Sequence, residues 1–367
     1  MQRLKLLGLE AVRCYAAILI ILFHLVHLAK LETPQSLSFV GSHFGFGVPL
    51  FYMVSAFGLL LGYHNNLNTQ ADYKSYYLRR FFRIAPLFYF MIAAYIPYLW
   101  FSYDGYLVPI SNIISSLLFI FNLIPSHVEG FVWASWSIGV EMVFYALLPL
   151  IIFFVGNLTT ASLFLLITLF IKYHWLQSFK DVTKNPVVAS FENYSFLGHI
   201  HYFAMGIFAY FAWNSIRSRK LSMRVTGLVL TLLGLIGLIS LMLYPAKAML
   251  IIVKVSNNNI SAFIYQISMA LCFITVVIGL CLHPTKILVN RLSCTLGKSS
   301  FSLYLWHPLI IVTLMKIGFY DLVYATTNNI FIAWTVSAVL TITVIAIIAN
   351  ISYRLIEVPG MKLSKRF

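Results

Sequence analysis

The strongest constraint on this chain is a series of long apolar segments separated by short polar loops. A helix needs about 20 apolar residues, within a range of about 17 to 25, to cross the hydrocarbon core of a bilayer. Ten segments approach or meet the required length: 7–29, 43–63, 84–101, 136–155, 158–172, 196–214, 225–243, 260–282, 299–320 and 330–353. An eleventh apolar stretch, 111–123, is too short to cross and is expected to be interfacial or re-entrant.

Composition agrees with a membrane protein. Hydrophobic residues make up 61% of the chain and charged residues only 10%, which leaves too little polar surface for soluble domains. We therefore predict an all-α fold, a polytopic membrane bundle of about ten transmembrane helices. Residues 1–367 are expected to form one membrane domain with no additional soluble domain. The four cysteines show no paired spacing and are expected to be reduced.

The distribution of cations predicts the orientation. With ten spans, 17 Lys and Arg residues fall on the side of the termini and six on the other, with Arg13 and Lys316 inside spans. Counting 111–123 as a full crossing changes the division to 11 and 12. The positive-inside rule therefore favours ten spans with both termini in the cytoplasm. It also explains the net charge of +15 without a nucleic-acid partner, because the cations lie in short loops.

The first apolar segment carries two ionisable residues that a simple span would not need. An ionisable side chain in the middle of a bilayer costs about 2.5–3.5 kcal/mol on insertion scales. Arg13 and His24 are eleven positions apart, about 1100° of helical rotation, so they lie on one face and about 16 Å apart along the axis. This shared face predicts a functional polar path.

A basic cluster marks the start of the third segment. Arg79, Arg80 and Arg83 lie among aromatic residues in the stretch YYLRRFFRIAPLFYF. Arg80 and Arg83 are three positions apart and point the same way on a helix, and guanidinium groups bind phosphate oxygens in pairs. The alternative is an ordinary topology and headgroup anchor.

Two further ionisable residues lie inside apolar segments. Glu141 needs a partner or a wet cavity, and Arg13, His24 and His307 are candidate partners. His307 is followed by Pro308, which frees a backbone carbonyl one turn earlier. The alternatives are a structural ion pair for Glu141 and a packing role for His307. No role is assigned to His43, Tyr52 or Lys316, and no metal site is predicted.

Taken together, these stretches resemble the acyltransferase-3 family of integral-membrane acyltransferases, which includes enzymes that O-acetylate bacterial surface polysaccharides. The resemblance runs in order along nearly the whole chain. It rests on the stretches LEAVRCYAAILIILFHL, GVPLFYMVSAFGLLLG, YYLRRFFRIAPLFYF, WSIGVEMVFYALLPL, LGHIHYFAMGIFAYF, LGKSSFSLYLWHPLI and YRLIEVPGMKLSKRF.

The resemblance implies transfer of an acyl group, acetyl in the simplest case, from cytoplasmic acyl-CoA to a hydroxyl of a surface polysaccharide, O-antigen or glycolipid precursor. No permanently bound cofactor is expected; acetyl-CoA is the donor substrate. The partners are the lipid bilayer, the donor and a glycan acceptor, and the location is the bacterial inner membrane. No oligomeric state is predicted.

The resemblance also implies roles for particular residues. Arg79, Arg80 and Arg83 would bind the phosphates of CoA, and Arg13 would steady the pantetheine or thioester end. His24 would be the general base or carry the acyl group, since an imidazole titrates near neutrality. Glu141 would orient His24 or compensate Arg13, and Trp136 and His307 would contact substrate. Transfer of succinyl or another acyl group, N-acyl transfer, and a proton-coupled transporter or flippase remain alternatives.

Overall fold

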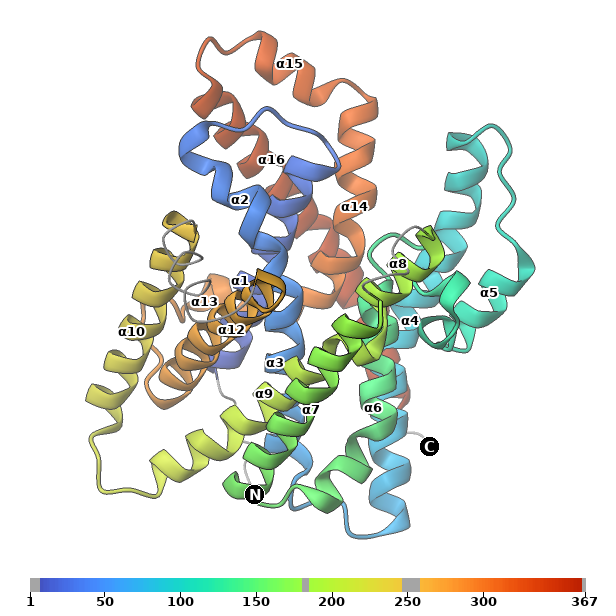
Figure 1. The fold of residues 1–367 in the computed structure, drawn as a ribbon. Coiled ribbons are helices and arrows are strands. Elements are labelled where there is room, and N and C mark those ends of the chain that lie inside the picture. Colours follow the sequence, from blue (N-terminus) through green and yellow to red (C-terminus); the bar gives the residue numbers. More distant parts are fainter. Residues whose placement is uncertain (1–6, 180–184, 246–257, 365–367) are drawn as a thin grey trace.

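The structure is a computed structural model that describes residues 7–179, 185–245 and 258–364, and the described residues are helical with no strand. The long helices are α1 (Leu7–His27), α3 (Gly47–Tyr63), α4 (Gln70–Ser102), α6 (Trp136–Phe154), α7 (Leu158–Ser178), α9 (Phe196–Arg217), α10 (Met223–Leu243), α12 (Asn258–Leu282), α14 (Ser300–Lys316) and α16 (Ile330–Ser352) (Figure 1). The short helices are α2 (Ser38–His43), α5 (Ile110–Leu117), α8 (Pro186–Tyr194), α13 (Arg291–Lys298), α15 (Phe319–Ala325) and α17 (Val358–Leu363).

Among the described residues, eight helices are long and apolar enough to cross a membrane, or nine if α14 and α15, bent by 59°, form one broken span. The chain is thus a multi-pass membrane protein, whereas the predicted count of about ten spans is not reached by this criterion. The stretch 111–123 contains only the eight-residue α5 and a 3₁₀ turn, in agreement with an interfacial or re-entrant segment. The cytoplasmic placement of the termini stays a prediction.

Helix α9 accounts for part of the difference. It covers the predicted segment 196–214 but is not among the membrane-compatible helices. His201, Phe203 and Ala204 are fully buried, and most of the helix is buried on all sides. A helix surrounded by other helices has no lipid-facing surface that must be strongly apolar, so α9 tolerates histidine and tyrosine.

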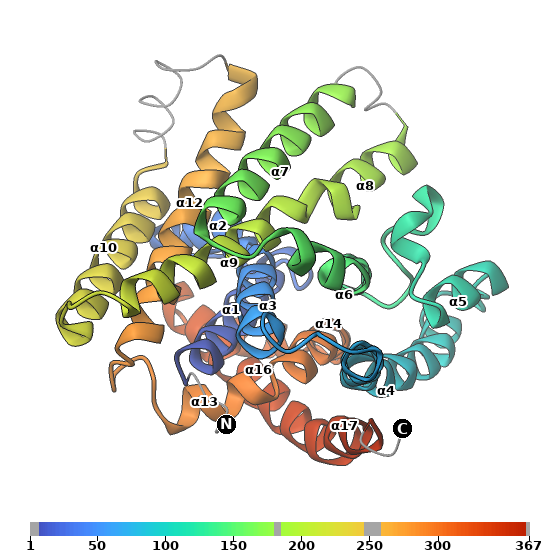
Figure 2. The ribbon, with the colours of Figure 1, turned by 90° about the horizontal axis from the view of Figure 1, so that it is seen from below.

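Helices α1 and α3 lie side by side at the centre of the bundle, with the other long helices around them (Figure 2). Their backbones are close, since a β-carbon at Gly47 would lie 2.6 Å from the carbonyl oxygen of Ala16 and 2.7 Å from Cγ1 of Ile20. At the other end of α3, Gly58 lies beside the guanidinium of Arg13. The two helices are therefore antiparallel, and successive turns of α3 lead from the level of Ile20 towards that of Arg13.

The buried apolar residues form two clusters. The larger one joins α3, α4, α6, α9 and α12, and the smaller one joins the second half of α1 to α2, α14, α15 and α16. Phe51 of α3 and Trp306 of α14 pack against both clusters. The boundary between the two cores therefore passes beside these two aromatic side chains.

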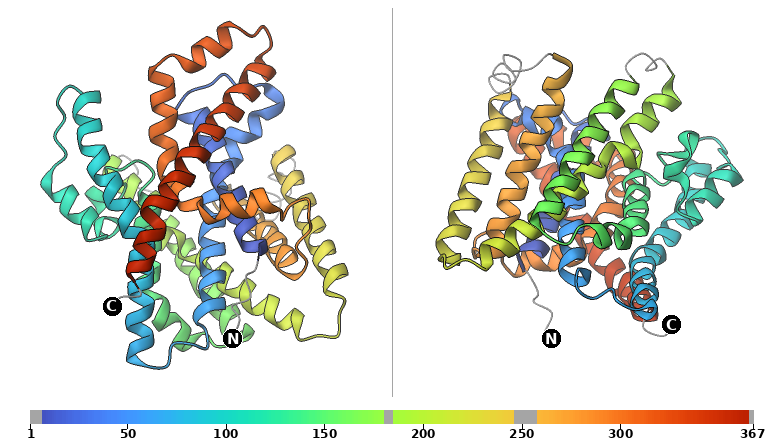
Figure 3. Two further views of the ribbon diagram at one scale, coloured as in Figure 1. Left: turned by 180° about the vertical axis from the view of Figure 1, so that it is seen from behind. Right: turned by 60° about the horizontal axis from the view of Figure 1, so that its bottom comes forward.

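Two elements bring the basic cluster into the bundle. Helix α4 begins at Gln70, well before the start of the predicted membrane span 84–101. Thr69 and Asp72 form a capping box that fixes this N-terminus. The basic cluster therefore lies on a helix. After α16, a π-helical turn at Tyr353–Glu357 leads into α17, which packs on α4 where Gly360 approaches Pro86 (Figure 3).

Candidate active site

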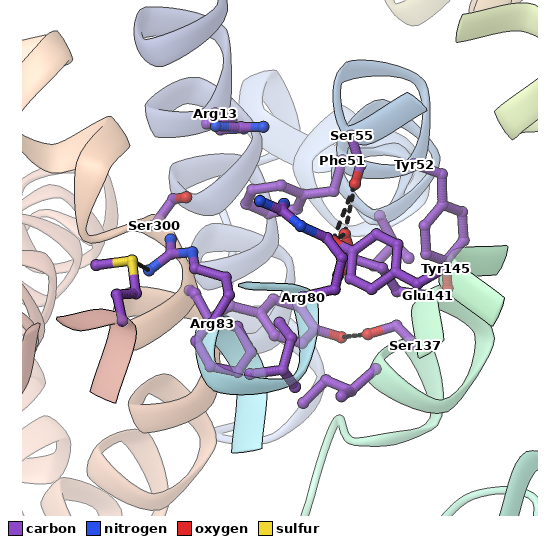
Figure 4. Close-up of a pocket in the computed structure, with 16 residues that line it drawn as sticks. Arg13, Phe51, Tyr52, Ser55, Arg80, Arg83, Ser137, Glu141, Tyr145 and Ser300 are labelled. Atoms are coloured by element: carbon purple, nitrogen blue, oxygen red, sulfur yellow. Dashed lines mark hydrogen bonds between the residues drawn. The ribbon is translucent and has the colours of Figure 1, made fainter. Parts of the chain in front are cut away.

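A polar cavity of about 270 Å³ lies between α1, α3, α4, α6, α14 and α17. It brings Arg13, Arg80, Arg83 and Glu141 together, although they come from three different helices (Figure 4). The complete lining is Arg13, Val48, Phe51, Tyr52, Ser55, Arg80, Arg83, Ile84, Ser137, Ile138, Glu141, Tyr145, Ser300, Phe301, Tyr304 and Met361.

Two of the arginines have no carboxylate partner. The guanidinium carbon of Arg80 lies 5.7 Å from the ring centroid of Tyr63 and 5.9 Å from that of Tyr145. The buried Nε of Arg80 has no hydrogen-bond partner within the described part of the chain. Neither Arg80 nor Arg13 forms an ion pair with any carboxylate of the described residues. Aromatic faces attract cations but do not neutralise them, so this wall of the cavity favours an anionic ligand.

Arg83 is different because a buried acid holds it. Its guanidinium forms an ion pair with Glu357, whose side chain is fully buried while that of Arg83 is 21% exposed. The Glu357 carboxylate also accepts a hydrogen bond from Ser302, and Arg83 donates to the carbonyl oxygen of Lys298 at 3.4 Å. The pair therefore joins α4, α14 and the π-helical turn, and it compensates one of the three cavity arginines.

Glu141 is held by hydroxyl groups. Its Oε1 accepts hydrogen bonds from Ser55 at 2.6 Å and from Tyr145. Among the described residues it has no hydrogen bond to His24 and no ion pair with Arg13. Glu141 therefore faces the same cavity as Arg13, but its immediate partners are neutral donors.

His24 has a different partner, His307. Nε2 of His307 lies 3.1 Å from Nδ1 of His24, and the two ring centroids are 4.8 Å apart. Nδ1 of His307 contacts the carbonyl oxygen of Tyr304, which is the carbonyl that Pro308 leaves without its helical donor. The sequence prediction of a freed carbonyl is thus confirmed, and the histidine one turn later uses it.

These contacts fix the tautomers of the neutral pair. A carbonyl oxygen only accepts, so Nδ1 of His307 carries the proton and its Nε2 is an acceptor. Nδ1 of His24 must then be the donor, and it also faces the carbonyl oxygen of Ile20 at 3.0 Å. No described residue forms a hydrogen bond with Nε2 of His24. The network therefore leaves that nitrogen with a lone pair available to accept a proton.

The histidine pair lies just beyond the cavity. His24 and His307 are not among the lining residues, but Tyr304 is, and its ring lies 5.5 Å from that of His307. Phe51 lines the same end and packs edge-on against Tyr304 at 6.0 Å. Two aromatic rings thus separate the cationic cavity from the His24–His307 pair.

Two other predicted site residues lie elsewhere. Arg79 does not line the cavity, which matches the helical spacing that points Arg80 and Arg83 in another direction. Trp136 is also outside the lining; its ring packs against Tyr194 and His199 at centroid distances of 4.9 and 5.1 Å.

Sequence reasoning missed several residues of the site, Glu357 and Tyr52 among them. Glu357 appears in a stretch that carried the resemblance, YRLIEVPGMKLSKRF, but it was assigned no role. Tyr52 was also left without a role and lines the cavity. A signal existed for Glu357, because an acid directly after the last apolar segment invites a search for a basic partner. No comparable pattern marks Tyr52 among neighbouring aromatic residues.

Comparison with known proteins identifies the family of this chain. A model of the acyltransferase domain of the acyltransferase-3 family matches residues 6–350. The chain belongs to the acyltransferase-3 family. The match to this family includes Arg13, His24, Glu141 and His307, and it ends before Glu357.

The curated relatives that match the chain have low sequence identity to it. The chain is 26% identical over 394 residues to proteins named O-acetyltransferase OatA from Staphylococcus aureus strains NCTC 8325 / PS 47 and COL. The alignment covers 97% of this chain but 57% of each relative, so this acyltransferase-3 chain spans little more than half their length. No solved structure matches the chain.

Proposed function

We propose that this membrane acyltransferase is an O-acetyltransferase that moves an acetyl group from acetyl-CoA to a hydroxyl of a cell-surface polysaccharide or glycolipid precursor. The observation that carries the proposal is His24, whose Nε2 is kept free by His307 beyond one end of a cationic cavity. Family membership and the name of the OatA relatives support the reaction type. The distribution of cations supports a bacterial inner-membrane protein with cytoplasmic termini.

The donor would enter the cavity with its phosphates towards the arginines. Arg80 has an uncompensated guanidinium at the cavity wall, and Arg83 lies one turn further along α4. Guanidinium groups suit phosphate because two N–H groups match two oxygens. Arg13, on α1, would steady the pantetheine arm. The donor's thioester would then point past Tyr304 and Phe51 towards His24.

The chemistry needs one base and no permanent cofactor. Nε2 of His24 accepts the proton of the acceptor hydroxyl while the hydroxyl oxygen forms a bond to the acyl carbon. The C–S bond of the thioester breaks, and the proton passes from His24 to the CoA thiolate. The hydrogen bond from Nδ1 of His24 to His307 stabilises the transient imidazolium and keeps the ring in position.

The test uses the full chain in liposomes that contain a glycolipid acceptor, with [¹⁴C]acetyl-CoA supplied as donor. The wild-type protein should transfer label to the glycolipid, and His24→Ala should lose at least about 100-fold in rate, as expected for removal of a general base. His27→Ala is the matched control: its exposed ring lies one turn further along α1 and contacts only the carbonyl oxygen of Gly41 at 2.8 Å among hydrogen-bond partners in the described residues.

The outcomes separate the candidate functions. Label on the acceptor with wild type and His27→Ala, and none with His24→Ala, supports acetyl transfer. An active His24→Ala variant refutes the role of His24. Acceptor movement across the bilayer, driven by a proton gradient and without any acyl donor, supports a transporter and overturns the proposed function.

A further inference from the structure

The Tyr52 side chain has a structural position that the known activity of the family does not explain. The residue is 2% exposed, it lines the cavity, and its hydroxyl has no hydrogen-bond partner among the residues that the structure describes. A buried polar group without a partner is unfavourable, and native proteins rarely leave one without a reason. Because the Tyr52 side chain lines the cavity, a ligand that approaches its hydroxyl can supply the missing partner.

The other two tyrosines of the cavity wall are already engaged. Tyr145 donates its hydroxyl hydrogen to Glu141, and Tyr304 donates to the carbonyl oxygen of Ala134 at 2.9 Å. Ser137 donates to the Tyr304 hydroxyl at 2.6 Å. Of the three tyrosines that line the cavity, Tyr52 is therefore the one whose hydroxyl forms no hydrogen bond within 3.5 Å to any described residue.

Stacking fixes the direction of the Tyr52 ring. It stacks on Phe203 with centroids 4.6 Å apart and planes inclined by 27°, and Phe203 stacks on Phe144 at 4.0 Å. His199 meets the Tyr52 ring edge-on at 5.6 Å. A ring held on this side by a column of aromatic residues cannot turn to seek a partner, so its hydroxyl is preorganised for whatever occupies the cavity.

The level of Tyr52 along α3 indicates which part of the donor it meets. Gly58 lies at the level of Arg13, Ser55, one turn earlier in α3, contacts Glu141, and Tyr52, a further turn earlier, lies closer to the level of Ile20. Ile20 is one turn before His24 on α1. Since the arginines would hold the phosphates, the group that reaches Tyr52 is the acyl end of the donor.

We propose that the Tyr52 hydroxyl donates a hydrogen bond to the carbonyl oxygen of the donor's thioester and is a catalytic residue of acyl transfer. This inference rests on the proposed function. As the acceptor oxygen bonds to the acyl carbon, the carbonyl oxygen gains negative charge, which the Tyr52 O–H stabilises. When the C–S bond breaks, the C=O bond re-forms and Tyr52 keeps its proton throughout. The hydroxyl proton of the acceptor passes through His24 to the CoA thiolate, so the step is balanced.

The test is a steady-state comparison of wild type, Tyr52→Phe and Tyr95→Phe in the liposome assay with varied acetyl-CoA. Tyr52→Phe keeps the ring and its stacking and removes only the hydroxyl. Tyr95→Phe is the matched control, because Tyr95 is fully buried and its hydroxyl also lacks a hydrogen-bond partner in the described ranges, but it does not line the cavity. Both variants should melt at or above the wild-type temperature, since each loses an unsatisfied buried group.

A donor to the developing oxyanion acts mainly in the transition state. Tyr52→Phe should therefore lower kcat about 100-fold, with KM for acetyl-CoA changed by no more than about twofold. Tyr95→Phe should match wild type in both constants. An unchanged kcat for Tyr52→Phe overturns the proposal, and so does a raised KM with normal kcat, which would indicate binding of the unreacted donor. If the wild-type protein transfers no acetyl group, the proposed function fails as well.

Discussion

The Arg83–Glu357 pair provides the sharpest test of the cavity's electrostatics. Glu357→Gln keeps the size of the side chain and removes its charge, which leaves the Arg83 guanidinium uncompensated. Removing one partner of a buried ion pair costs about 3–5 kcal/mol. Because the Arg83 side chain is 21% exposed and reaches the cavity, water can partly solvate it, so the lower value of about 3 kcal/mol applies.

The measurement is a double-mutant cycle. Glu357→Gln, Arg83→Gln and the double variant would be purified in detergent and unfolded with a denaturing detergent, with tryptophan fluorescence as the signal. Each single change should lower the free energy of unfolding by about 3 kcal/mol, and the double variant by no more than either single change. The coupling would then be about 3 kcal/mol, at the upper end for residues in contact. Arg79→Gln, one turn before Arg83 and outside the cavity lining, should cost less than about 0.5 kcal/mol.

Additive effects within about 0.5 kcal/mol would refute the reasoning, because they would mean that Arg83 and Glu357 do not stabilise one another. A double variant more stable than wild type would not refute the reasoning, since replacing both members of a buried ion pair is often neutral or stabilising.

Two further predictions concern donor binding and packing. Arg80→Ala should raise KM for acetyl-CoA at least about tenfold, because it removes an uncompensated guanidinium from the cavity. Arg79→Ala should leave this KM unchanged. Equal effects of the two changes on KM would remove Arg80 from the proposed donor site. Gly206→Ala should destabilise the protein, since a β-carbon there would lie 2.2 Å from the carbonyl oxygen of Met53, while Gly62→Ala meets nothing within 4 Å. Melting temperatures in detergent check this pair, and equal values for the two variants would contradict the close packing of α3 on α9.

Local sequence was sufficient wherever the relevant contacts lie within one helix. Helical spacing predicted that Arg80 and Arg83 face the same way, and both line the cavity while Arg79 does not. The proline rule predicted a free carbonyl one turn before Pro308, and His307 binds it. Apolar length and charge likewise predicted an all-helical membrane fold, since these properties reflect the bilayer rather than any particular partner.

Sequence was insufficient wherever a contact joins distant helices. The Arg83–Glu357 pair connects residues 274 positions apart, and the His24–His307 contact spans 283. Tyr52 acquires its significance only because its neighbours in the folded cavity are already hydrogen-bonded. Helix α9 resembled a span by its apolar content, but the helices packed around it, which the sequence does not reveal, decide that it meets protein on most sides.

The cavity arginines differ in whether an acid is paired with them, and this difference affects the stability of the folded state. Glu357 compensates the charge of Arg83, whereas Arg13 and Arg80 share a confined space with one carboxylate, Glu141, which forms an ion pair with neither of them in the part of the chain that the structure describes. Mutual repulsion is then part of the ligand-free protein, and any anion bound between them relieves it. A bound anion stabilises the native state in proportion to the logarithm of its concentration above its dissociation constant. On the proposed function, the acetyl-CoA donor would therefore also act as a structural counter-ion, and pyrophosphate or sulfate would be expected to replace it in that capacity during purification.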